Sequence, residues 1–227
     1  MHFSRRLLQL FVGLAAYGFA IALMVRAAIG VAPWDVLSQG LVRHTGLTFG
    51  TVVLVTSFVV LLLWIPLRQR PRFGTIANAL LIGPIADLGL RVLPQQTEWW
   101  AQGLTFAGGL LLLAVASGLY IGADFGPGPR DGLMLGLHAR LGWRVGVART
   151  VIEVTVLAAG WLLGGQVGIG TVAEALLIGP LVSLTLPLFA VAPRASSTPL
   201  APPAPAPPST LPSQCATDSA ETTPTRR

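Results

Sequence analysis

The chain is built from long apolar runs separated by short polar turns. A helix needs about 20 apolar residues to cross the hydrocarbon core of a bilayer. Six runs approach or reach this length, and they cover residues 7–25, 50–67, 73–92, 103–122, 146–163 and 170–191. The pattern predicts an all-α polytopic membrane protein with about six transmembrane helices.

Two further segments, residues 31–46 and 127–142, combine apolar residues with Asp, Arg and His, and glycines bracket each of them. They are too polar to cross a membrane comfortably and too apolar for ordinary loops. We expect each to form a short re-entrant helix. Irregular backbone at membrane depth must be buried in protein or line water, so these segments are the natural place for a functional site.

Residues 30–84 recur without a gap at residues 126–180, with 21 of 55 positions identical. The shared residues are mostly glycines and prolines, together with one aspartate. A duplicated, glycine-interrupted apolar unit is typical of membrane transporters built from two repeats. We therefore divide the chain into repeats at 1–96 and 97–192. The tail at 193–227 is rich in Pro, Ala, Ser and Thr, and we expect it to be disordered.

Composition places the helices in a membrane. Hydrophobic residues form 53% of the chain, charged residues only 11%, and the mean hydropathy is +0.70. Soluble domains carry about 25% charged residues, so the lipid bilayer is the expected partner. The net charge of +6 does not indicate nucleic acid, because the arginines lie in short loops between apolar runs. With one cysteine, Cys215, and no catalytic or metal-ligand motif, we expect neither a cofactor nor an enzyme.

The arginines also distinguish six spans from eight. Leaving out Arg149 and the far tail, six spans with a cytoplasmic N-terminus put nine arginines inside and three outside, whereas eight spans give seven and five. The positive-inside rule favours six. This arrangement predicts a multi-pass protein with both termini cytoplasmic and the loop at Glu98 outside. Because three spans per repeat is an odd number, the repeats must be inverted.

A Gly-x-x-Pro-x-Asp motif opens each short segment. Together with Arg130, its members are the candidate substrate-binding residues: Gly30, Pro33, Asp35, Gly126, Pro129 and Asp131. Pro suits the first turn of a helix, and Asp is stabilised near a helix N-terminus, so helix capping alone could explain the motif. A half-helix N-terminus inside the membrane is also an anion site, and a membrane-buried Asp can carry a proton or cation. The sequence leaves both interpretations open.

Three more charged residues are candidates for gating or a proton relay. Arg149 and Glu153 lie one turn apart and could neutralise each other as a buried pair. Glu174 lies near the start of the last helix, where the helix dipole offers a simpler explanation. Asp87 and Arg91 have the same four-residue spacing near a helix end, where we expect a solvated pair.

Small residues mark helix starts and helix faces. Thr75 and Thr171 follow glycines at the start of the last helix of each repeat, and we expect them to be N-caps. Glycines at four-residue spacing permit close helix packing, either within one chain or between copies in a homo-oligomer. They are Gly118, Gly122, Gly126, Gly132 and Gly136.

With these motifs, the chain resembles the YczE/YitT-type family of bacterial integral membrane proteins. The resemblance rests on the Gly-x-x-Pro-x-Asp motifs, the two Gly-Thr pairs, the repeated Ala-Leu-Leu-Ile-Gly-Pro and the stretch from Gly126 to Gly132, and it covers roughly residues 5–190. It implies a polytopic membrane protein, which we expect in the bacterial inner (cytoplasmic) membrane. It supplies no substrate and no functional residue.

The sequence as a whole favours a small-solute or ion transporter with a central site between two inverted repeats. The alternative is a membrane scaffold or accessory protein that transports nothing.

Overall fold

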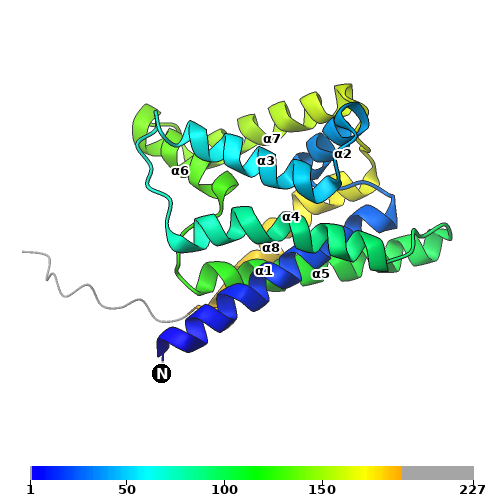
Figure 1. Cartoon of the computed structure of the whole chain (residues 1–227), viewed down its shortest axis with the longest axis horizontal. Coiled ribbons are helices and arrows are strands. Elements are labelled where there is room, and N and C mark those ends of the chain that lie inside the picture. Colours follow the sequence, from blue (N-terminus) through cyan, green and yellow to red (C-terminus); the bar gives the residue numbers. More distant parts are fainter. Residues whose placement is uncertain (1, 191–227) are drawn as a thin grey trace, which may run out of the picture. The chain divides into compact units, whose positions relative to one another are not determined.

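The computed structural model describes residues 2–190, and the predicted disordered tail at 193–227 lies outside them. The described residues form eight α-helices and no strands (Figure 1). The helices are α1 (His2–Ala27), α2 (Pro33–Thr45), α3 (Phe49–Leu63), α4 (Phe73–Val92), α5 (Trp99–Gly122), α6 (Pro129–Leu141), α7 (Val145–Leu162) and α8 (Ile169–Phe189). The expected all-α class is confirmed.

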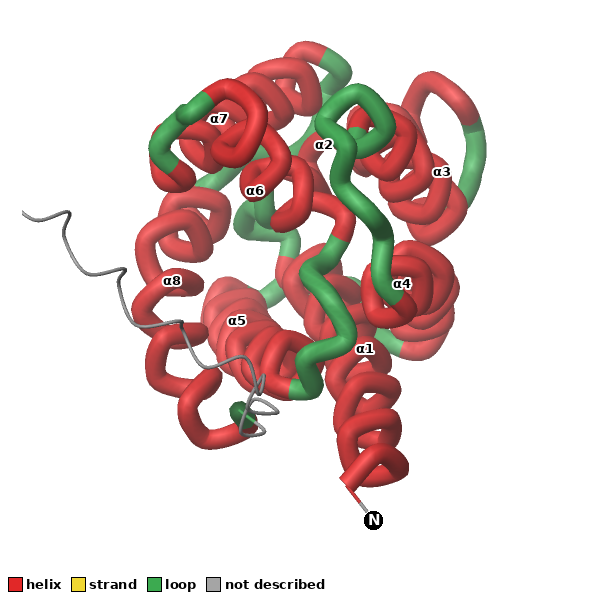
Figure 2. The backbone as a smooth tube through the Cα atoms, turned by 90° about the vertical axis from the view of Figure 1, so that its left-hand side faces the viewer, coloured by secondary structure: helices red, strands yellow, loops and turns green. Residues whose placement is uncertain are grey.

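Helices α1, α4, α5 and α8 form one layer, and α2, α3, α6 and α7 lie beside it (Figure 2). Within the first layer α1 packs on α4 and on α5, and α5 packs on α8. In the second layer α2 packs on α7, and α6 contacts both α3 and α7. Between the layers, α3 packs along α4.

Five helices, α1, α4, α5, α7 and α8, are long and apolar enough to cross a membrane. Helix α3 has 15 residues and is too short by itself, but α2 and α3 together form a sixth candidate that bends by 113°. The structure therefore agrees with a multi-pass membrane protein of five or six spans. Re-entry of α2 and α6 and inversion of the repeats stay predictions.

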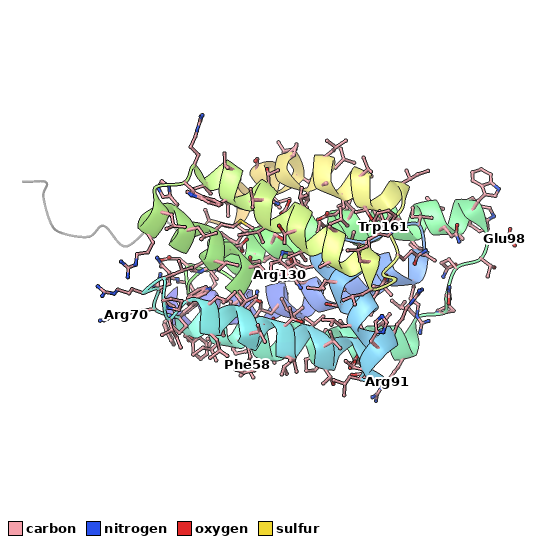
Figure 3. The ribbon with its side chains drawn as sticks, turned by 90° about the horizontal axis from the view of Figure 1, so that it is seen from above. Phe58, Arg70, Arg91, Glu98, Arg130 and Trp161 are labelled. Atoms are coloured by element: carbon pink, nitrogen blue, oxygen red, sulfur yellow. The ribbon has the colours of Figure 1, made fainter. Side chains whose placement is uncertain are left out.

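Contacts between loops assign the helix ends to two ends of the bundle. At the first, called the Arg72 end here, Asp124 forms ion pairs with Arg6 at 3.1 Å and with Arg72 at 3.5 Å. At the other, the Gln96 end, the backbone N–H of Gln96 donates to the carbonyl of Arg26 at 3.0 Å. Arg70 and Glu98 lie at opposite ends of the molecule (Figure 3).

The two short helices do not traverse the bundle. Gly30, just before α2, lies against Gly168, and Arg43 near the end of α2 lies against Gly164, so both ends of α2 are near the α7–α8 turn. Helix α6 stays at the Arg72 end. Gly126, just before it, lies against Arg72, and Arg140 near its C-terminus donates to the carbonyl of Pro66 at 3.5 Å.

The loop before each short helix docks on the last helix of the other half. The N–H of Gly74 donates to the carbonyl of Phe125 at 3.0 Å, and the N–H of Gly170 donates to the carbonyl of Ile29 at 2.9 Å. These two bonds join equivalent positions of the sequence repeat. The repeated glycines that follow, Gly30 and Gly126, have φ values of +122° and +116°, which L side chains rarely adopt.

The two threonines predicted as N-caps stand three residues farther into their helices. Arg72 and Gly168 are the N-cap residues, and their backbone N–H groups donate to the hydroxyls of Thr75 and Thr171, both at 3.3 Å. Each threonine is therefore at position N3, where its side chain satisfies the backbone N–H of the N-cap residue, as the N3 side chain does in a capping box. The Thr75 hydroxyl also donates to the carbonyl of Pro127 at 2.7 Å.

The spaced glycines pack against helices of the same chain. Gly118 and Gly122 of α5 lie against Thr185 and Phe189 of α8. Gly132 in α6 lies against the ring of Trp64. These faces are therefore already used inside one molecule, and a homo-oligomer through them has no support from these contacts.

Candidate functional site

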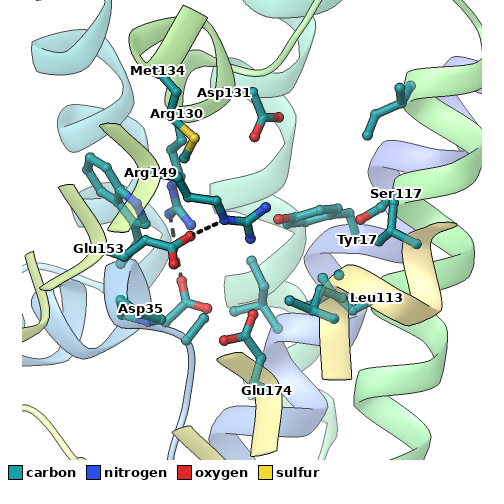
Figure 4. Close-up of a pocket in the computed structure, with 18 of the residues that line it drawn as sticks. Tyr17, Asp35, Leu113, Ser117, Arg130, Asp131, Met134, Arg149, Glu153 and Glu174 are labelled. Carbon is teal, nitrogen blue, oxygen red and sulfur yellow. Dashed lines mark hydrogen bonds and ion pairs between the residues drawn. The ribbon is translucent and has the colours of Figure 1, made fainter. Parts of the chain in front are cut away.

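A polar cavity with a volume of about 380 Å³ lies between the two layers. Helices α1, α2, α5, α6, α7 and α8 all contribute to its wall. Its polar and charged lining residues are Tyr17, Trp34, Asp35, Ser117, Tyr120, Arg130, Asp131, Arg149, Glu153, Glu174 and Ser183. Figure 4 shows carboxylates and guanidinium groups directed into this space.

Asp35 and Arg130 form an ion pair across the two halves of the protein. Pro33 and Pro129 start α2 and α6, and this brings Asp35 and Arg130 into the first turn of each helix. Arg130 Nη2 lies 3.7 Å from Asp35 Oδ1, and its guanidinium carbon lies 5.1 Å from the centre of the Trp34 ring. Asp35 is only 4% exposed, and its Oδ1 accepts no hydrogen bond from the described residues.

Asp131 occupies the equivalent position in α6 but has a different partner. The Tyr120 hydroxyl donates to Asp131 Oδ2 at 2.8 Å. Tyr17 packs edge-on against Tyr120, with ring centres 5.8 Å apart. The two repeated aspartates therefore both face the cavity, one beside a guanidinium and the other beside a neutral hydroxyl.

The predicted pair Arg149–Glu153 is present in α7 and lines the same cavity. Arg149 Nε donates to Glu153 Oε1 at 2.9 Å. The side chain of Arg149 is 49% exposed and that of Glu153 is 26% exposed. This pair therefore lies where the cavity approaches the molecular surface, beside α8.

Glu174 reaches the cavity from α8 and is 7% exposed. Among residues 2–190, no hydrogen bond or ion pair to its carboxylate is present. It differs in this respect from Asp35, Asp131 and Glu153, each of which has a polar partner. Helix capping alone does not describe its surroundings, because the side chain lines a shared charged cavity.

The glycines and prolines of the two motifs shape the site. Gly30 lies against Thr171, and Gly126 lies against Arg72 and Thr75. The carbonyl of Pro129 accepts a hydrogen bond from Trp64 Nε1 at 3.0 Å. These contacts hold the starts of α2 and α6 against neighbouring helices.

Two equivalent helix pairs of the repeats, of which only the second lines this cavity, are packed differently. Gly50 in α3 and Gly83 in α4 bring their backbones into direct contact, and a side chain at either position would clash with the other. Their repeat equivalents are Gly146 in α7 and Gly179 in α8. Within the described part of the chain, no atom outside the chain neighbours and the backbone of the same helix lies within 4 Å of the place a Cβ would take at either one. We call α3–α4 the closed pair and α7–α8 the open pair.

Asp87 holds the closed pair together. Its carboxylate accepts a hydrogen bond from the N–H of Gly50 at 2.7 Å and another from the Thr48 hydroxyl, both at the N-terminus of α3. The expected Asp87–Arg91 ion pair is not formed among the described residues. A carboxylate at a helix N-terminus satisfies free amides and interacts favourably with the helix dipole, which explains the change of partner.

Ser183 is the repeat equivalent of Asp87, and it points back to its own helix. Its hydroxyl donates to the carbonyl of Gly179 at 2.9 Å. A second, smaller cavity of about 50 Å³ lies beside the closed pair and shares Tyr17, Tyr120, Arg130 and Asp131 with the large one. Arg130 and Asp131 therefore lie between the large cavity on one side and the small cavity on the other.

Sequence reasoning missed the roles of Tyr17, Tyr120 and Asp87. The two tyrosines lie inside apolar runs with no local motif. The repeat equivalent of Asp87 is Ser183, and this difference in charge was the one sequence feature that could have drawn attention to Asp87. In residues 2–190, no group of His, Cys, Asp and Glu side chains is arranged to hold a metal ion.

Comparison with known proteins adds the family. Residues 4–187 match the model of a protein family described as "Family of unknown function (DUF6198)". The chain belongs to this family. It is 32% identical over 201 residues to the "Uncharacterized membrane protein YczE" of Bacillus subtilis, covering 85% of this chain and 94% of that protein. The resemblance to a YczE-type family is therefore confirmed.

Two other relatives have equally general descriptions. An "Uncharacterized protein" of Haemophilus influenzae is 35% identical over 181 residues, which cover 80% of this chain and 83% of that protein. The "Uncharacterized protein YyaS" of Bacillus subtilis is 25% identical, over 78% of this chain and 90% of that protein. No solved structure matches the chain.

Proposed function

We propose that the protein is a small-solute or ion transporter with its central site in the 380 Å³ cavity. Two inverted repeats would surround this site, and α2 and α6 would be re-entrant helices. The single observation that carries the proposal is the difference between two equivalent helix pairs. Gly50 and Gly83 are in contact, whereas Gly146 and Gly179 are apart.

The closed and open pairs face opposite ends of the bundle. Gly50 and Asp87 bond at the start of α3, beside the short α2–α3 turn. Gly146 lies at the start of α7, after α6, whose Arg140 contacts Pro66 at the Arg72 end. The cavity residues on α7 and α8 include Arg149, which is half exposed. This arrangement supports a site reached from the Arg72 end and closed from the Gln96 end.

A protein with two equivalent halves can exchange their conformations. In the second state, α7 and α8 would meet at Gly146 and Gly179 while α3 and α4 separate. The same site would then be reached from the other end, which is how inverted-repeat transporters alternate access. Small residues at both positions support this exchange, because close helix approach needs them. With the predicted orientation, the present state faces the cytoplasm.

To exchange the two packings, the protein would have to break the contacts that hold the closed pair. The closed pair is held by two hydrogen bonds to Asp87, by backbone packing at Gly50 and Gly83, and by apolar packing between α3 and α4. A hydrogen bond to a charged group contributes about 1.5–3 kcal/mol. Conformations that differ by a few kcal/mol interconvert and respond to ligands.

The proposal is tested with purified protein in liposomes. Uptake of radiolabelled amines, amino acids and inorganic cations is measured with and without a proton gradient. We expect uptake of at least one class above protein-free liposomes and its loss in the Gly179→Leu variant. If every class fails and the protein instead co-purifies with one partner protein, the scaffold alternative replaces the transporter.

A further inference from the structure

The charges of the central cavity do not balance. Its wall contains four carboxylates and two guanidinium groups. One guanidinium, Arg130, is paired with Asp35, and the other, Arg149, is paired with Glu153. Asp131 and Glu174 are the carboxylates that have no cationic partner among the described residues.

Of these two carboxylates, Glu174 has the greater need of a partner. Asp131 accepts a hydrogen bond from Tyr120, whereas the Glu174 carboxylate has no polar partner within residues 2–190 and is 7% exposed. A buried charge is costly unless it is paired, and an ionisable residue inside a membrane marks a functional site. Glu174 points into a cavity that has room for the missing partner.

An anionic ligand does not fit this arrangement. The helix N-termini of α2 and α6 are the parts of the fold that would attract an anion. Each already carries its own carboxylate in the first turn, Asp35 in α2 and Asp131 in α6. With these positions taken and two carboxylates in excess, the cavity favours positive charge.

The size of the cavity and its aromatic lining favour an organic cation. Pockets of about 300–1,000 Å³ hold small organic molecules, and this cavity has about 380 Å³. Tyr17, Trp34 and Tyr120 line it, and aromatic faces attract organic cations. Arg130 already shows such binding, because its guanidinium lies over Trp34 and beside Asp35.

We propose that the central cavity binds a small organic cation, an amine or a quaternary ammonium ion, with Glu174 as its counter-ion. The inference rests on the proposed function for its cavity and names the substrate class of that site. Binding itself can be measured without transport, so the two can fail separately.

The test uses the full chain in detergent at constant ionic strength, with thermal unfolding as the readout. Four cations are compared: methylammonium, tetramethylammonium, choline and tetraethylammonium. The matched controls are two analogues of choline with nearly the same shape, neutral 3,3-dimethylbutan-1-ol and anionic 3,3-dimethylbutanoate. A ligand that binds only the folded protein raises Tm in a concentration-dependent way.

We expect at least one cation to raise Tm saturably, whereas the neutral and anionic analogues leave it unchanged. In Glu174→Gln the affinity for that cation should fall by about tenfold or more, because a buried charge pair loses one partner. Glu174→Asp keeps the charge and should retain binding, which separates loss of charge from loss of fold. Glu98→Gln, in the exposed loop before α5, should bind like the native protein.

Three results would overturn the inference. They are the absence of saturable stabilisation by all four cations, equal stabilisation by an uncharged or anionic analogue, and unchanged affinity in Glu174→Gln. The last would mean that Glu174 holds only a proton. Cation binding without uptake in liposomes would reject the transporter and keep the site. Uptake of an anion without cation binding would reject the substrate class and keep the transporter.

Discussion

Gly50 and Gly83 lie in backbone contact, while Gly146 and Gly179, which occupy the equivalent positions 96 residues later in the chain, face open space. The same sequence element is thus found in two packings within one molecule. Asp87 bonds across the first pair, and Ser183 bonds within its own helix in the second. This difference connects the sequence repeat with the proposed transport cycle.

A large side chain in the open pair provides the first prediction. The first side-chain atom of Gly179→Leu would meet no neighbouring helix in the present structure, so we expect Tm to change little. The leucine would nevertheless prevent α7 and α8 from closing, and uptake into liposomes should be lost. Gly103→Leu is the matched control, because it also meets open space but lies far from the pair, near the start of α5. Full uptake by Gly179→Leu would contradict the proposed closure.

Removal of the Asp87 carboxylate should open the Gln96 end. Asp87→Ala leaves the N–H of Gly50 and the Thr48 hydroxyl without this acceptor, which should weaken the closed state by about 1–3 kcal/mol. The measurement is labelling of Ser57→Cys, which lines the small cavity, in a Cys215→Ser background. We expect an impermeant maleimide to label it faster from the Gln96 side.

The control for this experiment is Asp124→Ala. It removes ion pairs to Arg6 and Arg72 at the other end of the bundle. It should leave labelling of Ser57→Cys unchanged. If both variants accelerate labelling equally, general loosening of the bundle is the cause and Asp87 has no specific part in closure.

The pair Asp35–Arg130 should be needed as a pair. Asp35→Asn keeps the shape but leaves Arg130 without its counter-ion, and breaking a buried pair costs on the order of 3 kcal/mol. We expect a clear fall in Tm and in folded yield. Adding Arg130→Met should restore much of the stability, and unfolding of the single and double variants measures this coupling. Equal Tm in Asp35→Asn and the native protein would remove the pair from the account.

The predicted membrane orientation has its own test. Gln69 and Gln96 lie in loops that precede α4 and α5, and Arg70 and Glu98 in these loops lie at opposite ends of the molecule. Cysteines placed singly at Gln69 and Gln96 should react with an impermeant reagent from opposite sides, Gln96 from outside. Reaction of both from one side would exclude the six-span arrangement.

Much of the fold was predictable from apolar run length and from the repeat. The runs identified the long helices, and glycines with proline or aspartate identified α2 and α6, because such residues start and end helices. The run at 50–67 was too long: α3 ends at Leu63, and residues 64–68 form turns. Apolar turn residues next to a helix are indistinguishable from it by hydropathy alone.

The sequence predicted which residues belong to the candidate site better than it predicted which of them contact each other. The sequence singled out Asp35, Asp131 and Glu174, and all three line one cavity. It did not indicate that Arg130 reaches Asp35, because this contact joins helices far apart in the chain. It did not indicate that Tyr120 reaches Asp131 either, because that contact depends on how the turn between the consecutive helices α5 and α6 directs them. The difference between the open and closed pairs was equally hidden, since the glycines involved are identical in both repeats.

The most direct measurement of the central claim is the distance between spin labels on each helix pair, by double electron–electron resonance in lipid bilayers. Labels at Val55 and Leu88 report on the closed pair, and labels at Val147 and Leu184 report on the open pair; all four positions are exposed. We predict two populations for each pair that change in opposite directions, with Gly179→Leu retaining only the state described above. A single unchanged distance for each pair, with and without organic cations, would contradict alternating access.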